Sequence, residues 1–162
     1  MDGKVVAILG VGPGLGAAIA RRFSREGFAV SLMARRKESL SGVREEVEGT
    51  GGTALAVEAD ATDTASVAAA FDWVRNKFGD PGVFVYNAGA FQMGGIMELT
   101  PELFDDCFKA NCSGAFYGAQ QVVPAMVEEG RGTIILTGAT ASLRGSANFA
   151  RLVQSYQYLG DL

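Results

Sequence analysis

The sequence predicts an α/β protein with a doubly wound parallel sheet of about five strands and helices on both faces. Short apolar runs alternate along the chain with segments in which apolar residues recur every three to four positions. Glycine, proline and aspartate separate these segments, as turns and helix caps require. Alternation of this kind is typical of parallel strands joined by right-handed helical crossovers.

The first part of the chain contains three predicted strands and two predicted helices. A helix is expected over 17–23, and Leu15, Ile19 and Phe23, spaced i, i+4 and i+8, form its apolar stripe. The predicted strands are 5–9, 28–34 and 53–58, and the helix between the last two has Leu40, Val43 and Val47 on one face.

The second part begins with the clearest amphipathic helix of the sequence. Either Thr62 or Asp63 is a suitable N-cap for it. Thr100 and Pro101 supply a cap and a first-turn proline for a further helix, whose pattern continues through Asn111 to about residue 129. The remaining predicted strands are 82–86 and 133–137, and the apolar face of the amphipathic helix comprises Val67, Ala70, Phe71, Val74 and Phe78.

Composition excludes several classes of function. The chain has 162 residues, two cysteines, no histidine and a net charge of −4. Without histidine, neither a Cys/His zinc site nor a Ser-His-Asp triad can form, and we expect no metal site. Cys107 and Cys112 point to different sides of a helix, so we expect buried thiols and no disulfide. The acidic balance argues against nucleic acid, and no apolar run approaches the roughly 18 residues of a membrane span. We expect a cytoplasmic protein with neither partner.

A glycine-rich loop between the first strand and the first helix is the strongest functional signal. Glycines in this position permit a tight turn and close backbone approach, and the following helix presents free amides to a pyrophosphate. The expected cofactor-binding residues of the loop are Gly10, Gly12, Pro13, Gly14, Leu15 and Gly16.

Four motifs in order resemble the short-chain dehydrogenase/reductase family between about Lys4 and Gly145. Gly10, Gly14 and Gly16 match its Thr-Gly-x-x-x-Gly-x-Gly loop, with Leu9 where threonine is usual. Asp60, followed by Ala61, matches the acidic position that the family places near the adenine. Asn87, Ala88 and Gly89 match the family's Asn-Ala-Gly motif. Asn111 matches an asparagine of the family's catalytic set.

The resemblance implies a Rossmann-like dinucleotide-binding domain over 1–145. It further implies a nicotinamide cofactor and oxidoreductase activity on a small carbonyl or alcohol. It also implies a homo-oligomer that pairs through the helix containing Asn111.

Arg35 and Arg36 follow the second predicted strand, where no carboxylate occurs. An acid here would bind the ribose 2′-hydroxyl of NAD, whereas arginine accommodates the 2′-phosphate of NADP. The residues therefore favour NADP over NAD, and a solvated basic helix start is the alternative.

Only one residue of the family's catalytic set is found. No lysine lies four positions after any tyrosine; the tyrosines are at 86, 117, 156 and 158. The last lysine of the chain is Lys109. An ungapped match places Ala139, Leu152 and Tyr156 at the serine, tyrosine and lysine positions, although Thr140 or Ser142 could replace the serine if the turn is shifted. Asn111 alone is retained.

Residues 146–162 form a divergent C-terminal tail, so the fold is expected to be truncated at its C-terminal side relative to the family. Leu152, Tyr156 and Leu159 suggest a short helix over 151–161 that covers part of the sheet. If it leaves the fifth strand uncovered, that apolar edge is a site for dimerisation or aggregation. Three hypotheses remain: an NADP-binding oxidoreductase with impaired activity, a non-catalytic cofactor-binding or regulatory protein, and a shortened variant without independent activity.

Overall fold

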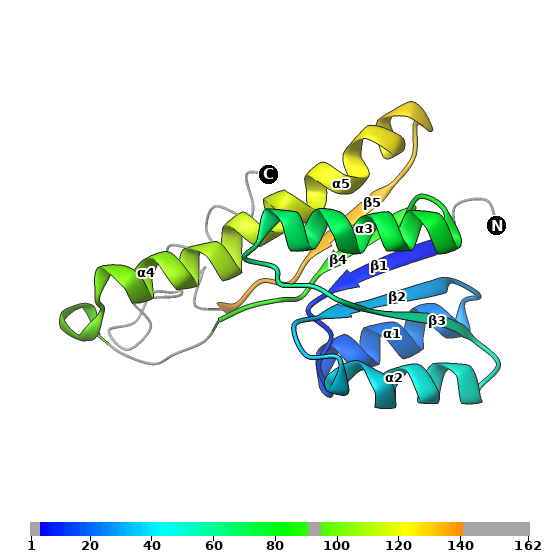
Figure 1. Ribbon diagram of the computed structural model, residues 1–162, viewed down its shortest axis with the longest axis horizontal. Coiled ribbons are helices and arrows are strands. Elements are labelled where there is room, and N and C mark those ends of the chain that lie inside the picture. Colours follow the sequence, from blue (N-terminus) through cyan, green and yellow to red (C-terminus); the bar gives the residue numbers. More distant parts are fainter. Residues whose placement is uncertain (1–3, 91–94, 141–162) are drawn as a thin grey trace.

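A parallel sheet forms the centre of the computed structural model, which describes residues 4–90 and 95–140 (Figure 1). Its strand order is β3-β2-β1-β4-β5, with every neighbouring pair parallel. This confirms the predicted fold class, and the predicted strands agree with the observed ones to within a residue at each end. The strands are β1 (Val5–Leu9), β2 (Ala29–Ala34), β3 (Thr53–Glu58), β4 (Val83–Tyr86) and β5 (Thr133–Leu136).

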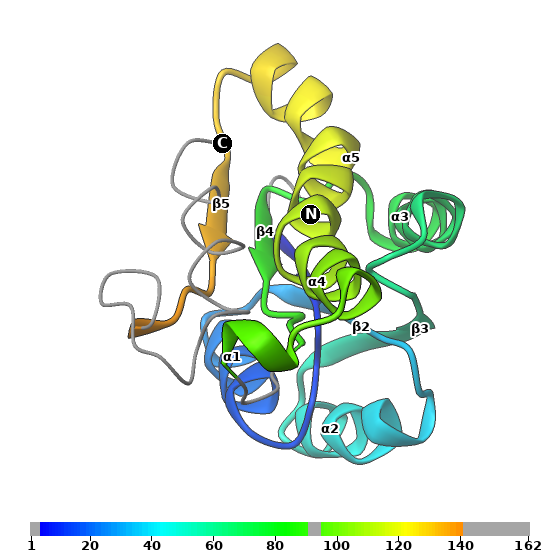
Figure 2. The same cartoon turned by 90° about the vertical axis from the view of Figure 1, so that its left-hand side faces the viewer.

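Helices cover both faces of this sheet (Figure 2). One face packs on α1 (Leu15–Arg25) and α2 (Glu38–Gly49), and the other packs on α3 (Thr64–Phe78) and α5 (Gly114–Glu128). Successive side chains of a strand point to opposite faces. In β1, accordingly, Val6 and Ile8 belong to the core beneath α1 and α2, whereas Val5, Ala7 and Leu9 belong to the core beneath α3 and α5. Both cores are apolar, as a sheet buried on both sides requires.

Helix α1 follows the predicted apolar stripe in part. Ile19 and Phe23 pack against the core beneath this face, but Leu15 is 56% exposed and lies outside it. The fully buried residues of the helix are Gly16, Ala17 and Ala20. The helix lies so close to the β1 loop that a Cβ on Gly16 would come within 2.8 Å of the Val11 Cα. Small residues permit this close approach, so the positions of the large apolar side chains alone do not identify the residues that the helix buries.

Helix α5 approaches β4 in the same way. A Cβ on Gly118 would overlap with the Phe84 ring, and one on Gly114 would overlap with the Tyr86 hydroxyl oxygen. Phe84 in turn packs edge-on against Phe71 of α3, with ring centroids 5.6 Å apart. The two glycines thus let the aromatic side chains of β4 fill the core between α3 and α5.

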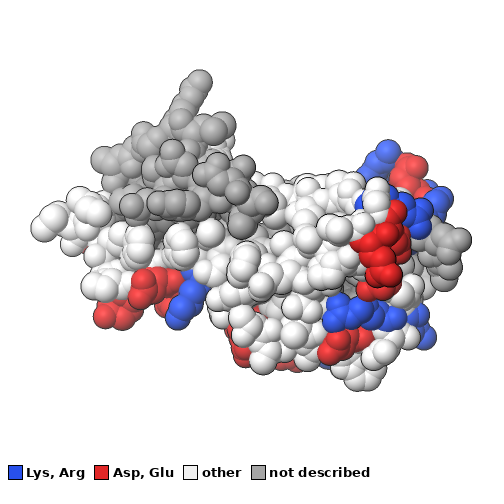
Figure 3. All heavy atoms as spheres, turned by 90° about the horizontal axis from the view of Figure 1, so that it is seen from above, with Lys and Arg blue, Asp and Glu red and all other residues white. Residues whose placement is uncertain are grey.

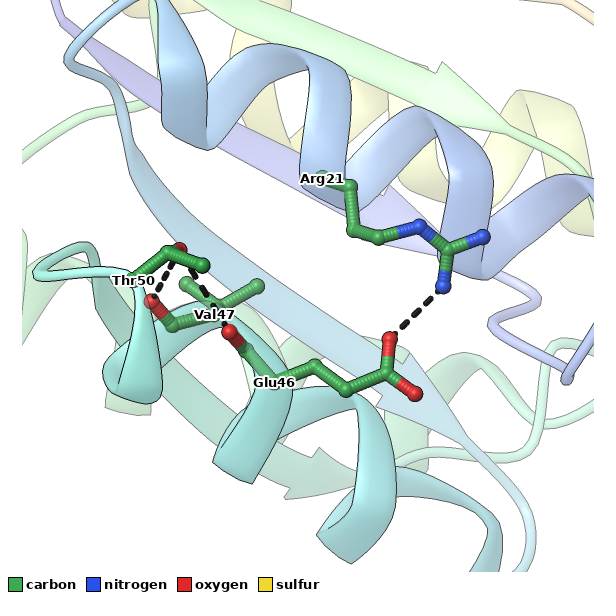
Figure 4. Close-up of polar contacts among 4 residues, drawn as sticks. All are labelled: Arg21, Glu46, Val47 and Thr50. Carbon is green, nitrogen blue, oxygen red and sulfur yellow. Dashed lines mark hydrogen bonds and ion pairs between the residues drawn. The ribbon is translucent and has the colours of Figure 1, made fainter.

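An ion pair joins α1 and α2 on the outer surface of their layer (Figure 4). The Arg21 guanidinium lies 2.7 Å from the Glu46 carboxylate, and both side chains are well exposed. Such exposed pairs contribute about 0–1 kcal/mol. At the end of α2, the Thr50 hydroxyl donates a hydrogen bond to the Val47 carbonyl at 2.9 Å, so it satisfies one of the free carbonyls of the last turn.

The structure settles two predicted helix starts. Asp63, not Thr62, is the N-cap of α3, and its side chain accepts hydrogen bonds from the backbone N–H groups of Ala65 and Ser66. Thr100 is the N-cap of α4 (Pro101–Phe108), as expected, and Pro101 is its first residue. Both caps satisfy amides that a helix leaves without intrahelical acceptors.

The helical pattern predicted through Asn111 is not one regular α-helix. A π-helical segment, η2 (Lys109–Ser113), separates α4 from α5 and contains Asn111. A separate 3-10 turn, η1 (Ile96–Glu98), precedes α4. Periodicity counts do not detect a π segment, because one wider turn leaves the flanking apolar pattern nearly intact.

One edge of the sheet is β3, and the other edge is β5, which pairs with β4. Ile134 and Ile135 remain 37% and 41% exposed on this strand. Residues 146–162, with the helix predicted over 151–161, lie outside the described residues, as does Ser142.

Charged side chains of both signs lie beside one another at both ends of the face seen from above (Figure 3). Within the described ranges, no helix is long and apolar enough to cross a membrane.

Candidate functional site

A cavity of about 460 Å³ lies at the carboxyl ends of the strands. The glycine loop and the segments after β2, β3 and β4 contribute to its wall. Asp106 of α4, which extends past the strand ends in Figure 1, and Ala110 of η2 complete the lining. Ligands of doubly wound sheets bind in such a crevice. The predicted site residues that line it are Gly10, Gly12, Pro13, Arg35, Arg36, Asp60, Ala61, Asn87, Ala88 and Gly89.

Gly10 makes the turn from β1 into the loop. Its φ of +102° is a conformation that L side chains rarely adopt. A Cβ there would also overlap with the backbone of Ala88. The N–H groups of Gly10 and Val11 both donate to the Met33 carbonyl, at 2.8 and 3.0 Å, which ties the turn to β2. Gly10 is therefore required by the backbone itself, whatever the loop binds.

The rest of the loop leaves space and positive potential for an anion. A Cβ added to Gly12 or Gly14 would meet no atom within 4 Å. Helix α1 begins directly afterwards, has no acidic residue in its first turn, and has Arg22 and Arg25 in its last turn. The partial positive charge of its N-terminus is thus uncompensated by the helix itself. Gly14, Leu15 and Gly16 do not line the cavity, and their predicted cofactor contacts stay a prediction.

The Asn87 side chain connects three strand ends. Its amide nitrogen donates to the Gly10 carbonyl at 2.8 Å, and its amide oxygen accepts from the Thr137 hydroxyl at 3.0 Å. The backbone N–H groups of Asn87 and Ala88 donate to the Leu9 carbonyl, at 2.7 and 3.0 Å. Asn87 therefore positions the glycine loop relative to β4 and β5.

Asp60 follows β3 and lines the cavity beside a hydrogen-bonded turn. One of its carboxylate oxygens accepts hydrogen bonds from the backbone N–H and the hydroxyl of Thr62, both at 2.8 Å. The Asp60 N–H donates to the Ser66 hydroxyl oxygen at 2.9 Å. Partial burial raises the pKa of the Asp60 carboxyl, but the two Thr62 hydrogen bonds and the nearby Arg35 guanidinium outweigh it, so the pKa lies below its usual value.

Arg35 and Arg36 lie between β2 and α2, with both side chains exposed. Within the described ranges, neither guanidinium forms an ion pair at 4 Å or less. The neighbouring Ser39 hydroxyl donates to the Arg36 carbonyl at 2.6 Å and also lines the cavity. Two guanidinium groups are thus available to a ligand anion at this end of the cavity.

Asn111 is fully buried in η2 and does not line the cavity. Its amide oxygen accepts from the Ala90 N–H at 2.8 Å, and its amide nitrogen donates to the Ala90 carbonyl at 3.1 Å. The preceding residue, Ala110, accepts a hydrogen bond from the Tyr86 hydroxyl. This geometry makes the Asn111 side chain a link between the π segment and the chain after β4; its predicted catalytic role stays a prediction.

The two cysteines are buried, as expected, and within the described residues they form no disulfide. Burial raises the pKa of the Cys112 thiol, which disfavours a reactive thiolate. Ala139, at the position where the family has serine, offers no hydroxyl, and Thr140 beside it is exposed. The described residues include no cluster of three His, Cys, Asp or Glu side chains suited to a metal ion.

Sequence reasoning missed Asp106, Ala110 and Ser39 as cavity residues. Asp106 and Ala110 are four positions apart, so they lie on one face of a helix. That spacing could have linked them to each other, but not to this cavity, because the position of α4 depends on contacts with the chain after β4.

Together, the sheet order, the glycine loop and the cavity define a doubly wound α/β protein with its ligand crevice at the strand ends. Residues 4–152 match the family profile described as short chain dehydrogenase, and the chain belongs to this family.

Curated relatives extend well beyond the matched region. A versicolorin reductase from Emericella nidulans is 35% identical over 90% of this chain and 55% of its own length. A sorbitol dehydrogenase from Cereibacter sphaeroides is 34% identical over 91% of this chain and 57% of its own length. The chain thus spans little more than half the length of these relatives.

Solved structures agree with the fold. A short-chain dehydrogenase from Rhodopseudomonas palustris superposes with a TM-score of 0.91 at 32% identity, covering 97% of this chain and 74% of that one. A variant of actinorhodin polyketide ketoreductase solved with NADPH has a TM-score of 0.93 at 31% identity, covering 98% and 61%. A metagenomic short-chain oxidoreductase in complex with NADP has a TM-score of 0.92 at 31% identity, covering 98% and 72%.

Proposed function

We propose that this chain binds a nicotinamide dinucleotide, NADP in preference to NAD, as an oxidoreductase of the short-chain dehydrogenase type. The observation that carries the proposal is one continuous cavity that brings together the glycine loop, Arg35, Arg36, Asp60 and the segment 87–89. Residues from four strand ends converge there, as a dinucleotide site of a doubly wound sheet requires.

The glycine loop fits the pyrophosphate. The backbone at Gly12 is open to close approach, and the adjacent N-terminus of α1 has no acidic side chain that would repel an anion. Anions bound at helix N-termini are stabilised by free amides and by the helix dipole. Asn87 and Met33 hold the loop through its backbone, so the loop is preorganised.

Arg35 and Arg36 favour a 2′-phosphate. Together with Lys37 they place three cations at the start of α2, where the helix dipole disfavours positive charge and Glu38 is the acidic residue of the first turn. A phosphate bound by the two guanidinium groups would relieve this repulsion and add charge-assisted hydrogen bonds. The alternative, a solvated basic helix start, predicts no effect of these arginines on cofactor choice.

The bound cofactor would supply or accept a hydride, and the substrate we propose is a small carbonyl or alcohol. A tyrosine needs a neighbouring cation to serve as proton donor near neutral pH, and the chain lacks the Tyr-x-x-x-Lys pair. With alanine at position 139, we propose impaired turnover, and Asn111 as the retained residue of the catalytic set.

A specific observation favours the second candidate, cofactor binding without turnover. Ala139 has no hydroxyl, whereas the glycine loop, Arg35, Arg36 and Asp60 line one cavity. A shortened variant without independent activity is the third candidate. We further propose a domain over 1–145 with a tail over 146–162, a cytoplasmic location, and a homo-oligomer.

Titration of the full chain with NADPH and NADH, followed by a reductase assay on a panel of carbonyls, tests the proposal. We expect NADPH to bind at least about tenfold more tightly than NADH, and the double variant Arg35→Ala, Arg36→Ala to lose about 10- to 100-fold in NADPH affinity with little change for NADH. Arg44→Ala, on the helix that follows these arginines and in an exposed pair with Glu48, is the matched control. Equal affinity of the wild type for both cofactors would overturn the NADP assignment.

Turnover separates the candidates. Binding with turnover supports an oxidoreductase, binding alone supports a non-catalytic cofactor-binding protein, and absence of binding supports the shortened variant.

A further inference from the structure

Two consecutive hydrogen bonds connect the end of β5 with the glycine loop. The Thr137 hydroxyl donates to the Asn87 amide oxygen at 3.0 Å, and the Asn87 amide nitrogen donates to the Gly10 carbonyl at 2.8 Å. The backbone of Thr137 is fixed by the sheet, because its N–H donates to the Tyr86 carbonyl at 2.9 Å. Gly10 and Asn87 line the cavity, whereas Thr137 does not. A side chain outside the cavity is thus joined to the cavity wall through Asn87.

The strand that leads into the loop supplies no hydroxyl at this junction. Leu9 lies where the family motif usually has threonine, and its side chain is buried in the core. In the part of the chain that the structure describes, the hydroxyl that contacts Asn87 comes instead from Thr137. The order β1-β4-β5 places that residue two strands away from the loop.

The two hydrogen bonds also fix the orientation of the Asn87 amide. Its oxygen accepts and its nitrogen donates, so reversal of the group would place its oxygen against the Gly10 carbonyl, one acceptor facing another. A Cβ on Gly16 would lie 3.4 Å from the amide nitrogen, so the amide is packed against the first turn of α1. Without the Thr137 hydroxyl, the partly buried amide oxygen would lose its donor, which is unfavourable.

The loop is held from two sides, and the supports are independent of each other. On one side, main-chain hydrogen bonds to the Met33 carbonyl tie the loop to β2, the strand that Arg35 and Arg36 follow. On the other side, the Asn87 amide ties the loop to β4 and β5. Removal of the Thr137 hydroxyl therefore weakens the second support and leaves the first support and the two arginines in place.

From this geometry we infer that Thr137 is a positioning residue for the pyrophosphate of the dinucleotide. It acts through Asn87, which holds the Gly10 carbonyl and with it the open backbone at Gly12 that lines the cavity. A loop that is already held in one position does not have to be ordered when the ligand binds. The inference rests on the proposed dinucleotide function.

Two ligands separate the pyrophosphate from the rest of the nucleotide. NADPH contains the pyrophosphate, whereas adenosine 2′-monophosphate has the base, the ribose and the 2′-phosphate without it. The full chain and its variants are titrated with both ligands, after circular dichroism has shown that each variant is folded. We expect Thr137→Val to weaken NADPH binding by about 5- to 10-fold, as the loss of one hydrogen bond predicts, and to change the affinity for adenosine 2′-monophosphate by less than about twofold.

Two further variants show whether the hydroxyl is responsible. Thr137→Ser keeps the hydroxyl and should retain the wild-type affinity for both ligands. Thr133→Val is the matched control, because it makes the same replacement at the exposed start of the same strand, outside the cavity wall. Thr137→Ala also removes the hydroxyl, and it takes the place of Thr137→Val if that variant does not fold.

The outcomes are distinct. An equal loss of affinity for both ligands in Thr137→Val, an unchanged NADPH affinity, or a loss in Thr137→Ser as large as that in Thr137→Val overturns the inference and leaves the proposed function standing. If the wild type does not bind NADPH, the proposed function fails, and the inference fails with it.

Discussion

Replacement of Gly10 by alanine should destabilise the fold strongly, although it adds a single methyl group. At φ +102° an alanine is strained, at a cost of about 1–2 kcal/mol. Its Cβ would also overlap with the Ala88 backbone, so β1 and the chain after β4 would have to separate. Three hydrogen bonds cross this junction: those from the Asn87 and Ala88 N–H groups to Leu9, and that from the Asn87 side chain to Gly10.

If the separation weakens these bonds, each contributes about 1 kcal/mol. The expected loss in the free energy of unfolding is therefore about 4–5 kcal/mol, a large share of the about 5–15 kcal/mol that stabilises a domain. Urea denaturation followed by circular dichroism measures this loss.

Gly12→Ala is the matched control for Gly10→Ala. It lies two residues further along the same loop, has no positive φ, and a Cβ there meets no atom within 4 Å. We expect its free energy of unfolding to change by less than about 1 kcal/mol. Equal stability losses for the two variants would refute the reasoning, because they would show that the close approach to Ala88 does not determine the requirement for glycine.

Two further predictions concern buried and partly buried polar groups. Among the buried side chains that the structure describes, the Ser31 hydroxyl has no hydrogen-bond partner, so Ser31→Ala should keep the free energy of unfolding or raise it by about 1 kcal/mol. Ser66→Ala, which removes the acceptor of the Asp60 N–H, should lower the free energy of unfolding. A decrease for Ser31→Ala as large as that for Ser66→Ala would contradict the expectation for Ser31. Because the pKa of Asp60 is lower in the folded chain than its usual value of 3.8, its stabilising contribution is complete above that value and is lost as the pH falls through the folded pKa. Asp60→Asn should therefore cost more stability at pH 7 than at about pH 3, and equal costs in urea denaturation at the two pH values would show that the carboxylate charge is not responsible.

Much of the candidate site could be predicted because its motifs follow directly after strands. Gly10, Arg35, Asp60 and Asn87 each follow a different parallel strand, and parallel strands end at one edge of the sheet. Their convergence on one cavity therefore follows from the strand pattern alone. Asp106 could not be placed in the same way, because it lies within a helix whose position depends on distant contacts.

Local patterns also could not separate two roles of the same residue type. Gly10 and Gly12 are equivalent in the motif, yet one meets the backbone after β4 and the other faces open space. Asn87 and Asn111 match family positions that the resemblance assigns to the cofactor and to catalysis, yet the structure shows both amides hydrogen-bonded to other parts of the chain.

The sequence by itself determined the succession of strands and helices along the chain and the position of the glycine loop between β1 and α1. It also determined the apolar faces of α2 and α3, and the N-caps of α3 and α4 to within one residue. These features depend on periodicity and on residues adjacent along the chain. The tertiary structure alone decided that α1 buries Gly16, Ala17 and Ala20 beside the predicted stripe and leaves Leu15 exposed, that a π segment contains Asn111, and that Asp106 reaches the cavity. The physical reason is the same in each case: the distance between two packed elements is set by side chains on both of them, and neither segment carries that information alone.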